Sequence, residues 1–177
     1  MSELVLDSTC SKKRNFPKNA TVRMDISPEA KPDLIASACL LPFRSGVFQQ
    51  IYCDPPHRIG RRFGMDKSGR NITDYYTRFS FWKNRREWLS FMFHSGKEFH
   101  RCLTDSGELI YKLPDGTRSK NTMIDRGDLK FLSNFKIIND DVIESQGFFA
   151  KSNIKNGKSK SYIHYIKMIK EKETKKE

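Results

Sequence analysis

Short apolar runs recur along the chain, and each is bounded by Pro, Gly, Asn or Asp, which is the pattern of β-strands. The runs are rich in Ile, Val, Leu and Tyr. The expected strands are Leu4–Asp7, Thr21–Ile26, Leu34–Ser37, Gln49–Cys53, Glu108–Leu113, Phe135–Asn139 and Ser161–Ile169. The last two are predicted to form an antiparallel pair joined by the basic loop Lys151–Lys160.

Helical spacing appears in two places. Apolar residues recur at nearly helical intervals from Arg85 to Leu103, which predicts a long helix, and Gly96 within it predicts a break or kink. A second helix is expected from Met123 to Leu132.

The connections between the first three strands are unusually short. Residues 8–20 just reach the roughly one dozen residues that a parallel crossover needs, so this crossover is expected to be partly irregular. Pro28 and Pro32 leave no room for a helix between the second and third strands. The third strand is therefore expected as a short edge segment or as an extended loop.

Acidic residues stand at the ends of these strands. Asp7 ends the first and Asp25 lies in the second, close to the offset of about 20 residues at which an acid meets ribose hydroxyls in nucleotide-binding α/β units. Acid-tipped parallel strands suit a nucleotide-like cofactor at the carboxyl edge of an open α/β sheet. The alternative is that the acids only cap the loops that follow.

The charge indicates a polyanionic partner. The 177 residues carry a formal net charge of +12, from 33 basic and 21 acidic residues, and Lys and Arg gain affinity by releasing phosphate counterions. From Arg58 to Glu87 basic residues outnumber acidic ones and alternate with aromatics, which suits single-stranded or looped nucleic acid. The candidate contacts are Arg58, Arg61, Arg62, Arg70 and Arg78. The alternative is a solvated loop whose aromatics, such as Trp82, cover the core.

Other features narrow the class of protein. The four cysteines are far apart and form no C-x-x-C pair, so neither a metal site nor a disulfide framework is indicated. No run approaches the roughly 18 apolar residues of a membrane span, and no signal peptide is recognisable. We therefore expect a cytoplasmic protein that does not bind membranes. The length leaves room for one domain, predicted over residues 1–168, with residues 169–177 as a charged tail.

Asp54-Pro55-Pro56-His57 follows the fourth expected strand directly and is the most specific motif. With the acid-tipped strands, it resembles the class I S-adenosylmethionine-dependent methyltransferase family, in particular its amino-methylating members with an Asp-Pro-Pro-aromatic loop. Val5–Cys10 resembles a Val-Leu-Asp-Ala-Thr-Cys-Gly variant of small relatives, although the family's glycine-rich first turn is absent. The resemblance spans residues 4–168 and implies a reduced Rossmann-like sheet, mostly parallel with a C-terminal antiparallel pair.

The resemblance also implies a site for S-adenosylmethionine. Asp25 would bind the ribose, Ile26 would lie against the adenine, and Asp7–Cys10 would form the turn around the methionine end. Ser37 stands where the family usually has an Asp that accepts the adenine amino group, a contact that Ser replaces only weakly. The implied cofactor contacts are Asp7, Ser8, Thr9, Cys10, Asp25, Ile26, Ser37 and Ala38.

The Asp-Pro-Pro-His loop carries the implied chemistry. An exocyclic amine conjugated to a base ring becomes a better nucleophile when acceptors draw its hydrogens out of the ring plane. The Asp54 carboxylate and a prolyl carbonyl of Pro55 or Pro56 can do this. His57 replaces the aromatic residue that usually stacks on a flipped base, and it could stack or accept a proton. The alternative is a rigid turn that leaves a strand.

The leading hypothesis is a methyltransferase that acts on an exocyclic nitrogen of a nucleic-acid base. RNA is favoured over DNA, because the chain has no room for a separate domain that reads a duplex. The alternative is a catalytically inactive methyltransferase-fold protein that binds nucleic acid or serves as a partner subunit. The absent glycine-rich turn and Ser37 favour that alternative. Methylation of a protein glutamine is a third, weaker possibility.

Overall fold

The structure is a computed structural model of the chain. It describes residues 3–10, 17–56, 59, 82–114, 126–132, 134–144 and 162–171.

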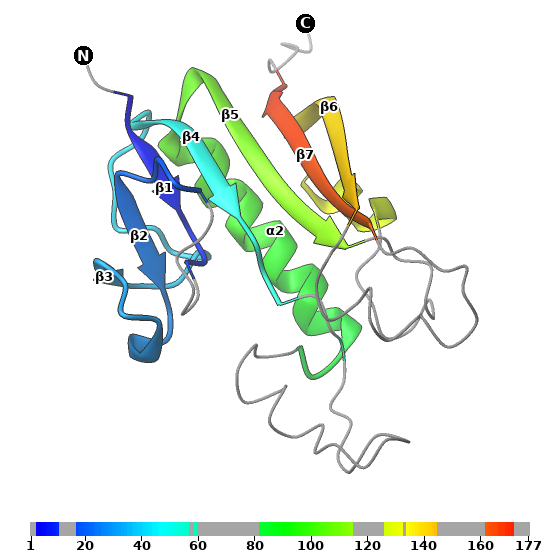
Figure 1. Cartoon of the computed structure of the whole chain (residues 1–177), viewed down its shortest axis with the longest axis horizontal. Coiled ribbons are helices and arrows are strands. Elements are labelled where there is room, and N and C mark those ends of the chain that lie inside the picture. The colour runs from blue at the N-terminus through cyan, green and yellow to red at the C-terminus, as the bar shows by residue number, and fades with distance from the viewer. Residues whose placement is uncertain are drawn as a thin grey trace, which may run out of the picture.

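Seven strands form one mixed sheet in the order β3-β2-β1-β4-β5-β7-β6 (Figure 1). The strands are β1 (Val5–Asp7), β2 (Val22–Asp25), β3 (Leu34–Ile35), β4 (Phe48–Cys53), β5 (Leu103–Pro114), β6 (Phe135–Glu144) and β7 (Tyr162–Lys170). The first five strands of this order, β3-β2-β1-β4-β5, pair in parallel, whereas β7 is antiparallel to both β5 and β6. The predicted α/β class, a mostly parallel sheet with a C-terminal antiparallel pair, is confirmed.

The short connections have the predicted consequence. Between β2 and β3 the chain forms only the 3-10 turn η1 (Pro28–Ala30), and β3 is a two-residue strand at the edge of the sheet. Of the two outcomes that the sequence left open, the short edge strand is therefore the one observed.

The C-terminal strand β7 ends at Lys170, one residue later than the predicted Ser161–Ile169, and so includes the first two residues of the predicted tail. Ile169 pairs with Glu108 of β5, and Lys170 pairs with Phe135 of β6. The Glu171 N–H donates to the Asn134 carbonyl at 2.9 Å. Strand pairing on both sides holds this segment despite its charge, since it satisfies the backbone groups. The rest of the predicted tail, residues 172–177, lies outside the described residues.

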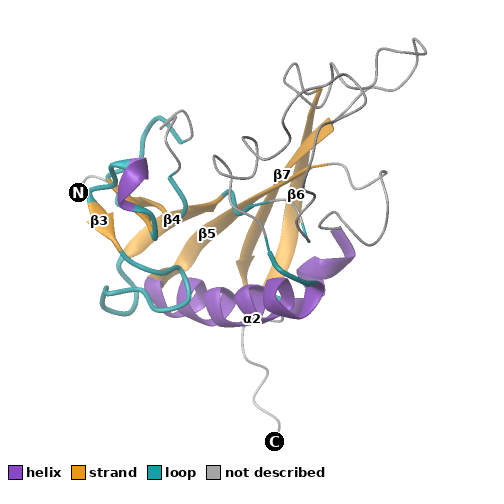
Figure 2. Cartoon of the chain, turned by 90° about the horizontal axis from the view of Figure 1, so that it is seen from below, coloured by secondary structure: helices purple, strands orange, loops and turns teal. Residues whose placement is uncertain are grey.

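Helix α2 (Arg85–Cys102) lies along one face of the sheet and leads directly into β5 (Figure 2). The Asn84 side chain caps its first turn by accepting the Glu87 N–H at 2.9 Å. Trp88, Met92 and Phe99 recur at helical spacing and are buried. No helix among the described residues is long and apolar enough to cross a membrane.

Helix α2 is continuous through Gly96, so the expected break there is wrong. Gly96 faces the 3-10 helix η2 (Arg126–Phe131), which forms part of the helix predicted over residues 123–132. A Cβ atom at Gly96 would lie 2.8 Å from Cδ2 of Leu132. The glycine therefore serves the close approach of two elements.

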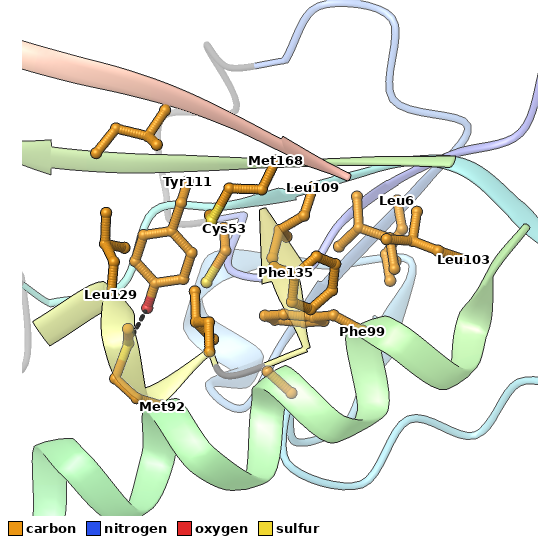
Figure 3. Close-up of a cluster of buried hydrophobic side chains, with 14 of the residues drawn as sticks. Leu6, Cys53, Met92, Phe99, Leu103, Leu109, Tyr111, Leu129, Phe135 and Met168 are labelled. Carbon is orange, nitrogen blue, oxygen red and sulfur yellow. Dashed lines mark hydrogen bonds between the residues drawn. The ribbon is translucent and has the colours of Figure 1, made fainter. Parts of the chain in front are cut away.

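The core lies between α2 and the sheet (Figure 3). Leu109 and Met168 from neighbouring strands are buried there together with Phe99 of α2. The Tyr111 hydroxyl donates to Sδ of Met92 at 2.9 Å, as the dashed line in Figure 3 marks. Among the described residues, the apolar side of the sheet thus packs against α2 and the η2 segment.

A second contact joins η2 to the start of α2. Asp128, which is buried, accepts the Trp88 indole N–H at 3.0 Å and forms an ion pair with Arg85. Because a buried carboxylate is costly without partners, these two donors fix η2 against α2.

The other face of the central strands is polar. Gln50 and Glu108 alternate with buried apolar residues along β4 and β5, as the two-residue period of a strand requires. The Gln50 amide donates to Glu108 at 3.2 Å, Lys167 of β7 pairs with the same carboxylate at 3.0 Å, and Tyr52 donates to Gln50 at 3.3 Å. These contacts join three strands outside the apolar core.

Replacement of Gly96 by Val should destabilise the protein by about 1–3 kcal/mol, because the added atoms meet Leu132 in a packed interface. Ser90→Val places the same β-branched residue on the exposed side of α2 and should change stability by less than about 0.5 kcal/mol. Urea denaturation of both variants measures the difference. Equal stabilities would show that Gly96 is not required for packing.

Candidate functional site

The order in which the chain adds strands to the sheet reverses at β1. The chain adds β2 and β3 on one side of β1 and then returns to add β4 on the other side. Ligands of open α/β sheets bind at the carboxyl ends of the strands at such a point. Asp7 ends β1, Asp25 ends β2, and Asp54 directly follows β4. The structure therefore brings the three acids to one edge of the sheet.

Asp7 is buried at this edge, with only 2% of its surface exposed. Oδ1 accepts the Thr9 N–H at 3.3 Å, whereas Oδ2 has no hydrogen-bond partner among the described residues. The pKa of Asp7 is raised to about 7, mainly by burial and also by charge repulsion from Asp54 and Asp25, while the Thr9 N–H and Arg23 act to lower it. An unpaired buried oxygen is costly, so a hydrogen-bond donor that reaches Oδ2 would be stabilising.

The turn after β1 is fixed by the strands on both sides. The N–H and the Oγ of Ser8 both donate to the Tyr52 carbonyl, at 2.9 and 2.8 Å. The Cys10 N–H donates to the Met24 carbonyl at 2.9 Å. The side chains of Ser8 and Cys10 are buried, so this turn would meet a ligand through its backbone and Thr9. Hydroxyl and backbone hydrogen bonds thus hold the turn that glycines form in the family.

The predicted adenosine contacts lie at the ends of β2 and β3. Ile26 is 73% exposed beside Asp25, whose Oδ1 accepts the Ser27 N–H at 2.9 Å. Ser37 accepts the Cys39 N–H at 3.2 Å, and Ala38 is buried in the core. An exposed apolar side chain beside a carboxylate suits a flat base attached to a hydroxylated sugar.

Three contacts from other described residues hold the loop that begins at Asp54. The Asp54 N–H donates to Oγ1 of Thr9 at 2.7 Å, and Nζ of Lys112 donates to Oδ2 of Asp54 at 2.5 Å. The Trp82 indole donates to the Pro56 carbonyl at 2.8 Å. Because the Pro56 carbonyl already accepts the Trp82 indole N–H, the Pro55 carbonyl is the better of the two prolyl candidates to accept a hydrogen of an amine.

Sequence reasoning missed Lys112. The available signal was the alternation along β5, where Lys112 lies between the apolar residues Tyr111 and Leu113, which are both buried. Such a pattern places the lysine on the polar face, but only the pairing of β5 with β4 brings it to Asp54.

Trp82 fulfils the structural alternative that the sequence left open. Its ring centroid lies 4.8 Å from that of Phe91 and 5.5 Å from that of Trp88, so it packs against the core. The remaining predicted site residues lie outside the described part of the chain: His57, Arg58, Arg61, Arg62, Arg70 and Arg78.

No family model and no curated protein matches the sequence. Solved structures do match its fold. The 1,6-didemethyltoxoflavin-N1-methyltransferase of Burkholderia thailandensis, with bound S-adenosylhomocysteine, gives a TM-score of 0.53 at 11% identity, covering 95% of this chain and 71% of that one. The magnesium protoporphyrin IX methyltransferase of Synechocystis PCC 6803, with bound S-adenosylmethionine, gives a TM-score of 0.50 at 15% identity. The match covers 96% of this chain and 71% of that one.

The chain has the Rossmann-like fold of class I methyltransferases. The [4+2]-cyclase SpnF matches it as well, with a TM-score of 0.54 at 10% identity, covering 96% of this chain and 75% of that one. One fold can therefore host different reactions, so the function has to be argued from the site.

The pKa of Asp7 predicts a pH-dependent stability. The native carboxyl, with a pKa of about 7 against 3.8 for the ordinary group, binds its proton more tightly than the unfolded chain does. Its contribution therefore lowers the free energy of unfolding as the pH rises from about 4 to about 7, by at most about 4 kcal/mol at 1.36 kcal/mol per pKa unit.

Asp7→Asn should remove this contribution, so that the variant gains stability relative to the wild type across the same pH range. Urea denaturation between pH 4 and 8 measures the gain. Asp105→Asn, at an exposed site on β5, is the control and should show no such trend. Parallel curves for wild type and Asp7→Asn would contradict the perturbed pKa.

Proposed function

We propose that the protein is an S-adenosylmethionine-dependent methyltransferase that acts on an exocyclic nitrogen of a nucleic-acid base, with RNA favoured over DNA. The observation that carries this proposal is the site at the switch point of the sheet. There the unpaired Oδ2 of buried Asp7 lies at the same edge as the Asp54-Pro55-Pro56 loop. The methyltransferase neighbours with bound cofactor or cofactor product support it.

The charges of the site fit this cofactor. S-adenosylmethionine carries a sulfonium and an amino group, which suit an acidic edge of the sheet. Oδ2 of Asp7 would accept a hydrogen bond from the amino group, Asp25 would bind the ribose hydroxyls, and exposed Ile26 would lie against the adenine. When bound, the cofactor supplies an electrophilic methyl group.

Asp54 would act on the other reactant. Its carboxylate accepts a hydrogen of the target amine, and the Pro55 carbonyl is the second candidate acceptor. These bonds draw the amine hydrogens out of the plane of the base, which localises the nitrogen lone pair for attack. The two prolines fix φ, so the loop pays little entropy to hold the amine in this geometry. We propose that His57 stacks on the base.

The charge of the chain supports nucleic acid as the substrate. The net charge is +12, and the proposed phosphate contacts are Arg58, Arg61, Arg62, Arg70 and Arg78. The side-chain nitrogen of a protein glutamine is conjugated like the exocyclic amine of a base. A glutamine substrate, however, would not explain the concentration of arginines after the Asp-Pro-Pro loop.

A second candidate is a methyltransferase-fold protein without activity that binds nucleic acid or serves as a partner subunit. Two observations favour it. The first turn lacks the family's glycines, and Lys112 and Trp82 already bind acceptors of the Asp54-Pro55-Pro56 loop.

Cofactor binding tests the first half of the proposal. The wild type should bind S-adenosylmethionine in a calorimetric titration, and Asp25→Ala should weaken binding by about 1–3 kcal/mol, the usual scale for unmade polar contacts. Asp105→Ala, which removes an exposed carboxylate near the amino end of β5, should bind like the wild type. A wild type that binds no cofactor at millimolar concentration would refute the proposal.

Methyl transfer tests the second half. Asp54→Ala should abolish the transfer of a tritiated methyl group to total cellular RNA while leaving RNA affinity nearly intact, because Asp54 acts mainly in the transition state. Digestion of the product then identifies the modified nucleoside. Transfer that persists in the variant would exclude this role of Asp54. Absence of transfer by the wild type to RNA, DNA or protein would favour the inactive alternative.

A further inference from the structure

We propose that Lys112 is a positioning residue of this site, which orients the Asp54 carboxylate toward the target amine. This inference rests on the proposed function. It assigns a task to a β5 side chain that lies outside the Asp-Pro-Pro-His motif.

The register of two parallel strands creates the contact. Cys53 of β4 pairs with Tyr111 of β5, so the residues that follow them, Asp54 and Lys112, lie level with each other. Tyr111 and Leu113 are buried on the α2 side, which places Lys112 on the opposite, polar face. Nζ of Lys112 lies 2.5 Å from Oδ2 of Asp54.

The ion pair is partly shielded from water. The Lys112 side chain is 20% exposed and the Asp54 side chain 30%. An ion pair that is mostly withdrawn from solvent is screened less by salt than a surface pair, so it restrains both side chains more strongly.

The acidic edge supplies a reason for the cation. The negative charges of Asp54 and Asp25 both raise the pKa of Asp7. The positive charge of Arg23 lowers the pKa of Asp7. Lys112 supplies a further positive charge, directly at Asp54, and so offsets the repulsion that would turn this carboxylate away from the other two.

Two contacts from described residues restrain Asp54. Thr9 binds its backbone N–H, and Lys112 binds Oδ2 of its carboxylate. The two oxygens of a carboxylate offer about four lone-pair sites, so the ammonium and an amine can be bound at the same time. An acceptor held in one orientation keeps the attacking nitrogen in line with the methyl group, and small misplacements there are costly in rate.

Three variants test the inference by the rate of methyl transfer to total cellular RNA. Lys112→Met keeps a side chain of similar length but removes its charge. It should lower the rate at saturating RNA by about 10- to 100-fold. The RNA concentration that gives half the maximal rate should stay within about threefold of that of the wild type, since a positioning residue does not bind RNA. Lys112→Arg, which keeps the charge, should restore most of the rate.

Lys167→Met is the matched control. Lys167 lies on the neighbouring strand β7, is 34% exposed, and pairs at 3.0 Å with Glu108 of β5. Its removal takes away one cation and one ion pair from the same sheet, and the rate should remain that of the wild type. A Lys112→Met variant as active as the wild type, or a Lys112→Arg variant as impaired as Lys112→Met, would overturn the inference. Equal losses in Lys167→Met would do so as well.

A structural readout separates this inference from the proposed function. In crystal structures, the Asp54 side chain should adopt a different rotamer in Lys112→Met from that in the wild type and in Lys112→Arg. An unchanged rotamer overturns the inference even where methyl transfer is observed. If the wild type transfers no methyl group, the proposed function fails, and with it the catalytic purpose of the contact. A changed rotamer would then still show that Lys112 positions Asp54.

Discussion

The parallel pairing of β1 with a neighbour on each side is the constraint on which the rest of the site depends. β1 has only three residues, all buried, and it pairs with β2 and β4 at once. A slip of one residue would turn Leu6 out of the core and Asp7 into it. The burial of Leu6 under α2 therefore fixes where Asp7 lies, and the pairing of β1 with β4 places the Asp54 loop beside it.

This constraint places a costly group at the carboxyl edge. Asp7 is buried with one unpaired oxygen, which opposes folding, while the apolar side chains between α2 and the sheet supply the stabilisation that offsets it. Natural proteins carry such conflicts mainly at functional sites. A ligand that donates a hydrogen bond to this oxygen would remove the conflict, so its binding would also stabilise the native state.

Local patterns in the sequence predicted the elements well, because strands and helices differ in the period of their apolar residues. They failed where contacts between distant segments decide the outcome. Gly96 indicated a break, but helix α2 runs through it and packs it against the side chain of Leu132. The charges after Met168 indicated a tail, but pairing with β5 and β6 extends the strand to Lys170.

The candidate site divides in the same way. The acids at the strand ends are visible in the sequence, since each follows a recognisable apolar run. The Lys112–Asp54 pair depends on the register between β4 and β5, and the bond from Trp82 to Pro56 depends on how the start of α2 packs. The motif therefore identifies the candidate site residues, whereas long-range packing decides their orientation. The neighbouring structures include both methyltransferases and a cyclase, so the fold alone does not determine the reaction, and the arrangement of the side chains at this edge has to be considered as well.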